Sequence, residues 1–175
     1  MAVYGLMAEF EEPGALLHAA ERAYASGYRK LDAYSPMPIH GLAEAIGFTR
    51  TAVSPIVLVG GILGCISGFT LCWWMAAVAY PHVVAGRPFN SWPMWIPITF
   101  ELTVLFASLT SLLAMLGLNR LPQPYHPVFN VPAFARASTD RFFLCIEAVD
   151  PVFDAEGTWK FLETLNPTSV AEVEP

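Results

Sequence analysis

The chain has 175 residues, enough for one ordinary domain or for a small domain with a membrane element. Apolar residues make up 55% of it and charged residues 14%, whereas soluble domains have about a quarter of their residues charged. The net charge of −6 argues against nucleic acid as a partner, because phosphate binding requires clustered Lys and Arg side chains.

The first 50 residues alternate between strand and helix patterns. Residues 3–10 predict a strand. Residues 11–27 predict a helix, because two acidic residues and a proline favour its first turn and a glycine favours its end. A second strand is predicted over residues 29–35 and a short helix over residues 41–46.

A metal site in this segment is one hypothesis, since it contains Asp32, His40 and Glu44. These residues flank prolines at no recognised metal-ligand spacing, so we interpret the two acids as solvated and the histidine as a capping or packing residue. The three cysteines form neither CxxC nor CxxCH. We therefore expect no metal and no cofactor bound by this chain, and no catalytic residue.

Two long apolar segments follow, over residues 55–80 and 93–118. No charged residue lies between Thr51 and Arg87, and only Glu101 lies between Arg87 and Arg120. Each segment has about 26 residues, or about 39 Å of helix, which crosses a hydrocarbon core of about 30 Å with room for tilt. A buried helix of a soluble protein can also be apolar all round, but two of this length in a small chain favour a transmembrane hairpin.

The charges around the hairpin predict its orientation. The loop over residues 81–92 holds one cation, Arg87, and the other eight Lys and Arg residues all flank the hairpin. Since cytoplasmic flanks are enriched in Lys and Arg, we expect both termini in the cytoplasm and the loop on the outer side of the membrane. Aromatic residues at the loop end, such as Tyr80 and Trp92, are typical of the membrane interface.

Glycine recurs at every fourth position of the first span, at Gly60, Gly64 and Gly68. Residues four apart share a helix face, so these glycines predict a smooth surface on which the second span or a partner helix packs closely. Simple enrichment of glycine in membrane helices is the alternative. The second span offers small counterparts: Ala107, Ser108, Ser111 and Ala114.

Glu101 is the one ionisable residue inside a span. A charged carboxylate there costs about 3 kcal/mol, so we expect it to be protonated, paired or facing a polar cavity. One interpretation is a proton path or a contact near a quinone, with Ser108 extending the polar track. The other is a neutral Glu hydrogen-bonded to a neighbouring helix. Neither span contains histidine, which argues against a haem held by this hairpin alone.

The segment after the hairpin completes the soluble part. Residues 121–132, with four prolines, predict an extended linker. A strand is predicted over residues 141–148, a helix over 155–165 and a last strand over 169–174. The order is βαβ, insertion, βαβ.

This order is typical of the split βαβ fold. We therefore predict a membrane α-helical hairpin of two transmembrane helices (residues 51–120) inserted in a small α+β ferredoxin-like cytoplasmic domain. Residues 1–50 and 121–175 form its two halves. Two loosely packed flanks are the alternative.

Three distinctive motifs are spread along the chain. They are VYGLMAEFEEPGALLHAAERAYASGYRKLDAYSPMPIHGLAEAIG at the start, GRPFNSWP in the loop and IPITFELTVLF in the second span. Together they resemble the small two-span subunit of bacterial alternative complex III, over nearly the whole chain and in the same order.

This resemblance implies a role in a respiratory chain. That complex oxidises quinol and passes electrons to a periplasmic acceptor such as a cytochrome c. Its haem c groups and iron-sulfur clusters are expected in partner subunits, beside large multi-span quinol-oxidising subunits. The chain itself is then an accessory, non-redox membrane subunit with a structural or assembly role, and no enzyme on its own. A proton-path role for Glu101 is carried over to the FEL motif as a suggestion.

A second class of function follows from the predicted soluble fold alone. Small ferredoxin-like domains host many functions, so the chain could be a membrane-anchored ligand- or metal-sensing protein. That hypothesis requires a saturable ligand for the soluble part, and the lack of a CxxC loop argues against a soft metal such as copper.

Overall fold

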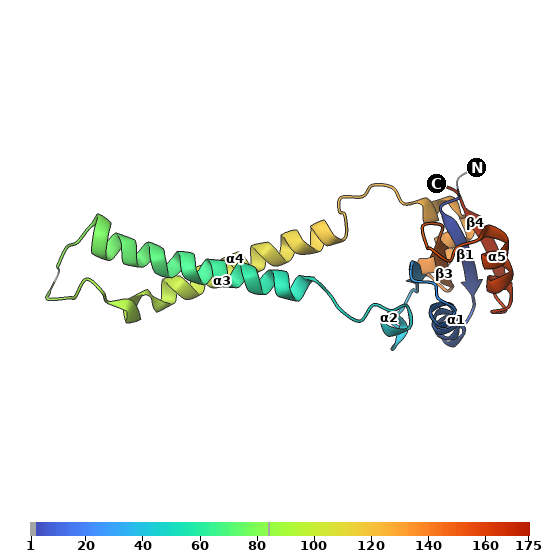
Figure 1. Ribbon diagram of the computed structural model, residues 1–175, viewed down its shortest axis with the longest axis horizontal. Helices are drawn as coiled ribbons and strands as arrows, with labels where there is room; N and C mark the ends of the chain where they lie inside the picture. Colours follow the sequence, from blue (N-terminus) through green and yellow to red (C-terminus); the bar gives the residue numbers. More distant parts are fainter. Residues whose placement is uncertain (1–2, 84) are drawn as a thin grey trace. The chain divides into compact units, whose positions relative to one another are not determined.

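The structure is a computed structural model that describes residues 3–83 and 85–175 (Figure 1). The chain divides into two compact units. Residues 51–123 form one of them, and residues 1–50 combine with residues 124–175 to form the other.

The unit formed by residues 1–50 and 124–175 is built on a four-stranded antiparallel sheet. Its strands are β1 (Gly5–Phe10), β2 (Leu31–Tyr34), β3 (Phe142–Glu147) and β4 (Ser169–Val173), in the order β2-β3-β1-β4. Helix α1 (Pro13–Ala25) connects β1 to β2, and α5 (Ala155–Glu163) connects β3 to β4. In each case a strand of the other half lies between the two connected strands, so the two halves of the sequence interleave.

These elements confirm the predicted strands and helices to within a few residues. The pairing of β1 with β3, from Gly5 opposite Glu147 to Phe10 opposite Phe142, excludes two loosely packed flanks. Gly27 follows α1 with a φ of +102°, as expected of a glycine that ends a helix. The Asp154 carboxylate, which the sequence analysis did not single out, accepts a hydrogen bond of 2.8 Å from the Gly157 N–H and caps α5.

The main core lies between one face of the sheet and the two helices. Because side chains alternate along a strand, Leu6, Ala8 and Phe10 of β1 point to this face, as do Phe142, Leu144 and Ile146 of β3. Their partners from the helices include Leu16, Ala20 and Leu162, all fully buried.

The opposite face of the sheet is also covered. Two 3₁₀ helices, Pro127–Asn130 and Pro132–Ser138, bury Val128, Val131 and Phe134 against β1 and β3. The expected extended linker therefore ends near residue 126, and the prediction for residues 127–132 is wrong. The prolines there begin 3₁₀ turns, a position that their fixed φ favours, and the apolar residues between them supply the packing.

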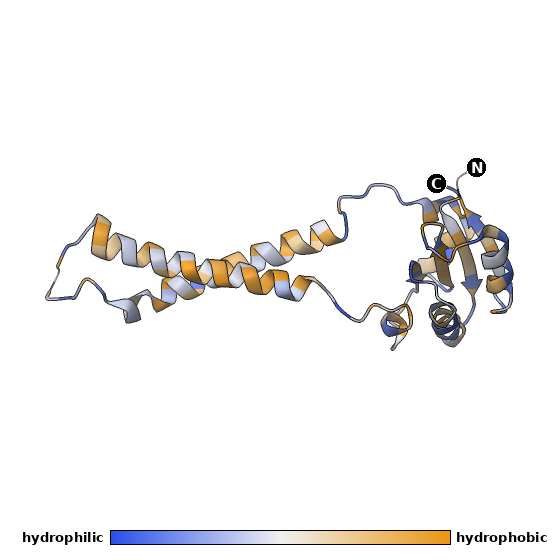
Figure 2. Cartoon of the chain, viewed as in Figure 1, coloured by the Kyte–Doolittle hydropathy of each residue, from blue (hydrophilic) through white to orange (hydrophobic). Residues whose placement is uncertain are grey.

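The other unit is a helical hairpin. Its first helix comprises α3 (Val53–Trp73) and a π-helical end, Trp74–Ala79; its second comprises a 3₁₀ turn, Trp92–Trp95, and α4 (Ile96–Leu118). Both helices, of 27 residues each, are long and apolar enough to cross a membrane. Hydrophobic colours run along both of them in Figure 2, as the sequence predicts.

Candidate functional site

The contact between α3 and α4 is made on the glycine face of the first span. Gly60, Gly64 and Gly68 are the only residues of α3 that are buried. A methyl group at Gly64 would collide with the carbonyl oxygen of Leu102 and lie 2.8 Å from the Cβ of Phe106. At Gly68 it would lie 3.1 Å from the Cα of Thr99, so the two backbones approach too closely for a side chain.

The surface of α4 that receives these glycines differs from the small residues expected. It is formed by Thr99, Leu102, Phe106 and Thr110, whose atoms are nearest to the three glycines. Of the small residues, Ala107 lies next to Gly61, with the two Cβ positions 3.8 Å apart. The glycine pattern correctly predicted which face of α3 packs against α4. The small residues of α4 were not needed for this contact, because the glycines leave enough room for larger side chains.

Glu101 and Ser108 lie elsewhere on α4. Both are exposed, and in the part of the chain that the structure describes no side chain forms a hydrogen bond or ion pair with the Glu101 carboxyl group. The Ser108 hydroxyl donates to the carbonyl oxygen of Leu105 at 2.9 Å, and the Thr103 hydroxyl donates to that of Thr99 at 2.7 Å. These hydroxyls thus bond to their own helix and form no continuous polar track with Glu101.

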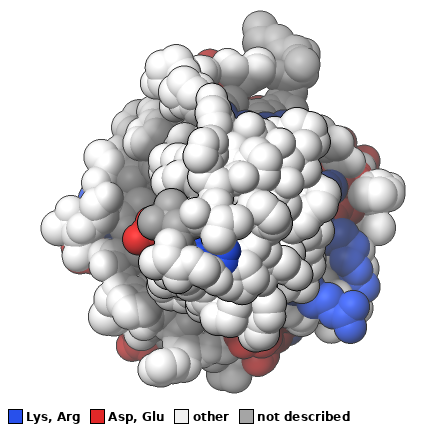
Figure 3. All heavy atoms as spheres, turned by 90° about the vertical axis from the view of Figure 1, so that its left-hand side faces the viewer, with Lys and Arg blue, Asp and Glu red and all other residues white. Residues whose placement is uncertain are grey.

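The loop end of the hairpin is held by aromatic and polar contacts. Trp95 is buried and meets Phe69 edge to face, with ring centroids 5.4 Å apart. Ser91, also buried, donates to the carbonyl oxygen of Pro88 at 2.5 Å and receives the Nε–H of Arg87 at 3.3 Å. Viewed from this end, the surface is mostly uncharged (Figure 3).

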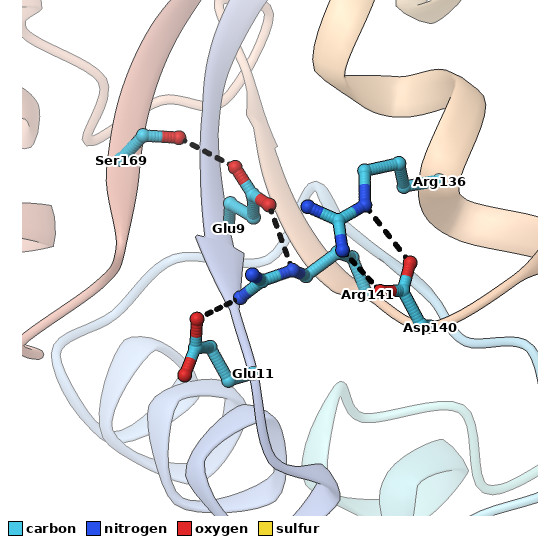
Figure 4. Close-up of polar contacts among 6 residues, drawn as sticks. All are labelled: Glu9, Glu11, Arg136, Asp140, Arg141 and Ser169. Carbon is cyan, nitrogen blue, oxygen red and sulfur yellow. Dashed lines mark hydrogen bonds and ion pairs between the residues drawn. The ribbon is translucent and has the colours of Figure 1, made fainter.

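The unit that contains the sheet, residues 1–50 and 124–175, is called the soluble unit below after its predicted role. A network of mostly charged side chains ties three of its segments together (Figure 4). Glu9 of β1 is buried; its carboxylate accepts the Ser169 hydroxyl of β4 at 2.8 Å and lies 3.4 Å from Nε of Arg141. That 3.4 Å separation is an ion pair without a hydrogen bond, since Nε has no acceptor of its own. Arg141 also binds Glu11, which is exposed. The network therefore joins the ends of β1, β3 and β4.

Asp150 fastens the turn after β3 to the start of β2. Its buried carboxylate accepts backbone N–H groups from Arg29 at 2.6 Å, Lys30 at 2.7 Å and Val152 at 2.9 Å. Burial alone would raise the pKa of Asp150, but the three hydrogen bonds outweigh it and lower the pKa below its usual value. The carboxylate thus stabilises the fold above its ordinary pKa, and this contribution is lost as the pH falls through the lowered pKa.

The second face of the sheet carries the one cysteine of the soluble unit. Burial, followed by the nearby carboxylates of Asp32 and Glu147, raises the pKa of Cys145 to about 12. Cys145 is therefore a neutral thiol at physiological pH and a poor nucleophile or metal ligand. Beside it, the Tyr4 hydroxyl donates to Glu147 at 3.3 Å and lies 3.4 Å from Nε2 of His126.

The metal hypothesis gains no geometric support. Across residues 3–83 and 85–175, no group of three or more His, Cys, Asp or Glu side chains is placed to hold a metal ion. Asp32, His40 and Glu44 lie on β2, in the following turn and on α2 (Leu42–Ala45), respectively. The buried carboxylates of Glu9 and Asp150 are both bound by groups from other segments of the chain. They therefore hold these segments together and have structural roles.

The ion pair of Arg141 makes a testable contribution to stability. Replacing Arg141 by Met leaves the buried Glu9 carboxylate without its counter-charge, so we expect the free energy of unfolding to fall by about 2 kcal/mol. Arg136→Met is the matched control, because Arg136 pairs with Asp140 on the exposed surface and its loss has a much smaller effect. Hydrogen exchange of the β1 amides in the detergent-solubilised chain measures the loss of stability in each of the two variants. Equal losses of protection would contradict the role of Arg141.

A second prediction concerns Gly64, where the helix contact brings α3 against the backbone of α4. Gly64→Ala places a methyl group against the backbone of Leu102, so the helices must separate and the melting temperature of the hairpin falls. Gly117→Ala is the control, since no atom outside the adjoining backbone of its own helix lies within 4 Å of its Cβ position, and alanine is the better helix former by about 1 kcal/mol. Circular dichroism in mild detergent follows the melting. A Gly64→Ala variant as stable as the control would refute the close contact.

Comparison with known proteins connects this architecture to one family. No curated protein matches the chain. Residues 4–172 match the family described as "Alternative complex III, ActD subunit", a region that includes the hairpin, strands β1 to β3 and all of β4 except its last residue. This confirms the resemblance seen in the motifs and implies partners in the same complex. With its two long apolar helices and its interleaved sheet, the chain belongs to the ActD subunit family of alternative complex III.

Proposed function

We propose that this chain is an accessory, non-redox subunit that anchors and helps assemble a quinol-oxidising respiratory complex. Electrons would pass from quinol to a periplasmic acceptor through haem c and iron-sulfur clusters of partner subunits. Large multi-span quinol-oxidising subunits would be its neighbours in the membrane. Membership of the ActD family is the observation that carries this proposal.

The surface of the hairpin supports a membrane role. Packing between α3 and α4 buries only the three glycines of α3 and no residue of α4, so large apolar side chains remain exposed all round both helices. Examples are Leu58, Ile66, Phe100 and Leu113, which are 64%, 58%, 65% and 67% exposed. An apolar surface of this extent requires lipid or partner helices.

The orientation of the hairpin follows from charge and connectivity. Because β1 and β2 share one sheet with β3 and β4, both ends of the hairpin lead back to the same soluble unit, which requires both on one side of the membrane. The loop has only Arg87, whereas the flanks have the other eight Lys and Arg residues. In our proposal that side is the cytoplasm, and the membrane is the bacterial inner membrane.

The strand order supports a ferredoxin-like, split βαβ domain. Helices cover one face of its sheet and residues 127–138 cover the other, so within the described residues neither face is free for a ligand. This arrangement favours a structural role over the ligand- or metal-sensing alternative.

Purification tests the proposed function. A tagged chain, extracted in mild detergent from its own membrane, should bring down several other subunits and the absorbance of haem c, because the chain needs partners to cover its apolar surface. Extraction with and without a stringent detergent wash serves as the control for adventitious binding. A stable, monodisperse chain without partners or haem would contradict the proposal.

A proton-path role for Glu101 has its own test. Glu101→Gln keeps the size of the side chain but cannot release a proton, so a relay through Glu101 predicts quinol oxidation slowed about tenfold or more in an intact complex. Ser67→Ala is the matched control in the first span, since it removes a hydroxyl that bonds only to the carbonyl oxygen of Gly64. Unchanged turnover in purified Glu101→Gln complex would make Glu101 structural.

A further inference from the structure

The residues of α4 that contact α3 occupy one side of the helix. Thr99, Leu102, Phe106 and Thr110 are spaced by three or four residues, and they supply the atoms nearest to the three glycines. Such spacing keeps residues on a single stripe of an α-helix. The stripe defines the inner side of α4 within the hairpin.

Glu101 and Ser108 lie on the outer side. With 100° between successive residues, both point about 150° away from the mean direction of the inner stripe, and they lie within about 20° of each other. Their neighbours on this side are apolar and about half exposed: Val104 at 49%, Leu105 at 48% and Leu112 at 56%. We call these five residues the Glu101 face.

The position of Glu101 within the span makes this exposure costly. Glu101 lies nine residues from Trp92, where the second helix begins, which corresponds to about 14 Å along the axis. A Glu side chain is too short to reach the interface from there, and an unsatisfied carboxyl group in hydrocarbon is strongly unfavourable. Helix α3 cannot satisfy it, because α3 occupies the inner side.

We propose that the Glu101 face docks on a transmembrane helix of a neighbouring subunit, and that this helix presents a hydrogen-bond donor to the Glu101 carboxyl group. The Ser108 oxygen, one further point of polar contact, lies two turns away on the same side. The proposal rests on the proposed function and identifies which surface of the hairpin meets the partner.

Two other occupants fit the face less well. Lipid tails offer no donor for a carboxyl group. A second copy of this chain, packed through the same face about a two-fold axis, would place Glu101 opposite Glu101, where the two carboxyl groups would have to share a proton and would offer each other no further donor. The glycine face is excluded as the docking surface for a partner, because α4 already fills it.

Photo-crosslinking in the assembled complex tests the docking surface. A benzophenone amino acid replaces Leu105, one turn from Glu101, in the full chain. The control replaces Ile66, which is exposed on α3 and lies between Gly64 and Gly68, the glycines that contact Leu102. We expect an adduct between this chain and another subunit from position 105, in clearly higher yield than from position 66.

Substitutions of Glu101 then test the hydrogen bond. Glu101→Gln keeps an acceptor and should retain the adduct from position 105. Glu101→Leu keeps the helix apolar but removes the acceptor, and should lower that adduct about three- to tenfold, the ratio that a hydrogen bond between membrane helices provides. Equal adduct yields in the two variants would overturn the hydrogen bond.

The outcomes separate the docking surface from the proposed function. Lipid adducts only, adducts to a second copy, or a yield no higher than from position 66 would overturn the docking surface if the chain still purified with its partners. An unsubstituted chain that purified without any other subunit would overturn the proposed function, and the docking surface with it.

Discussion

The close approach of α3 and α4 at three glycines is the contact on which the helical hairpin depends. Without side chains at Gly60, Gly64 and Gly68, the backbone of α3 reaches Thr99 and Leu102 directly. Lipid provides no hydrophobic drive between helices, so dense packing of this kind is one of the few interactions that can hold a hairpin together. It also fixes the rotation of α4 about its axis, and thereby turns Glu101 outward.

The soluble unit folds as one domain from two segments that are far apart in the sequence. Strand β1 pairs with β3 on one side and β4 on the other, so neither half can complete the sheet alone. The Glu9–Arg141 pair and the Asp150 carboxylate add polar ties between residues more than a hundred positions apart. Both ends of the hairpin therefore join the same unit along the chain.

Local patterns in the sequence predicted most of these elements. The first strands and helix were predicted from local apolar patterns and from Pro13 and Gly27, and the hairpin from two charge-poor segments. The βαβ order then implied the interleaved sheet. Features that depend on distant contacts were missed. Residues 127–132, which help to cover the second face of the sheet, looked like part of a proline-rich linker. Nothing local pairs Glu9 with Arg141 or matches Thr99 and Leu102 to glycines of α3. For Glu101 the sequence left open a proton path and a hydrogen bond to a neighbouring helix, because the direction of its side chain depends on the helix contact.

One disulfide tests this helix contact most directly. The Cβ positions of Gly61 and Ala107 are 3.8 Å apart, within the range that a disulfide spans. A chain with Gly61→Cys and Ala107→Cys, and with Cys65 and Cys72 replaced by alanine, should therefore form an intramolecular disulfide in native membranes on mild oxidation. Reduced cysteines after oxidation, or disulfides only between chains, would show that the glycine face is not occupied by α4.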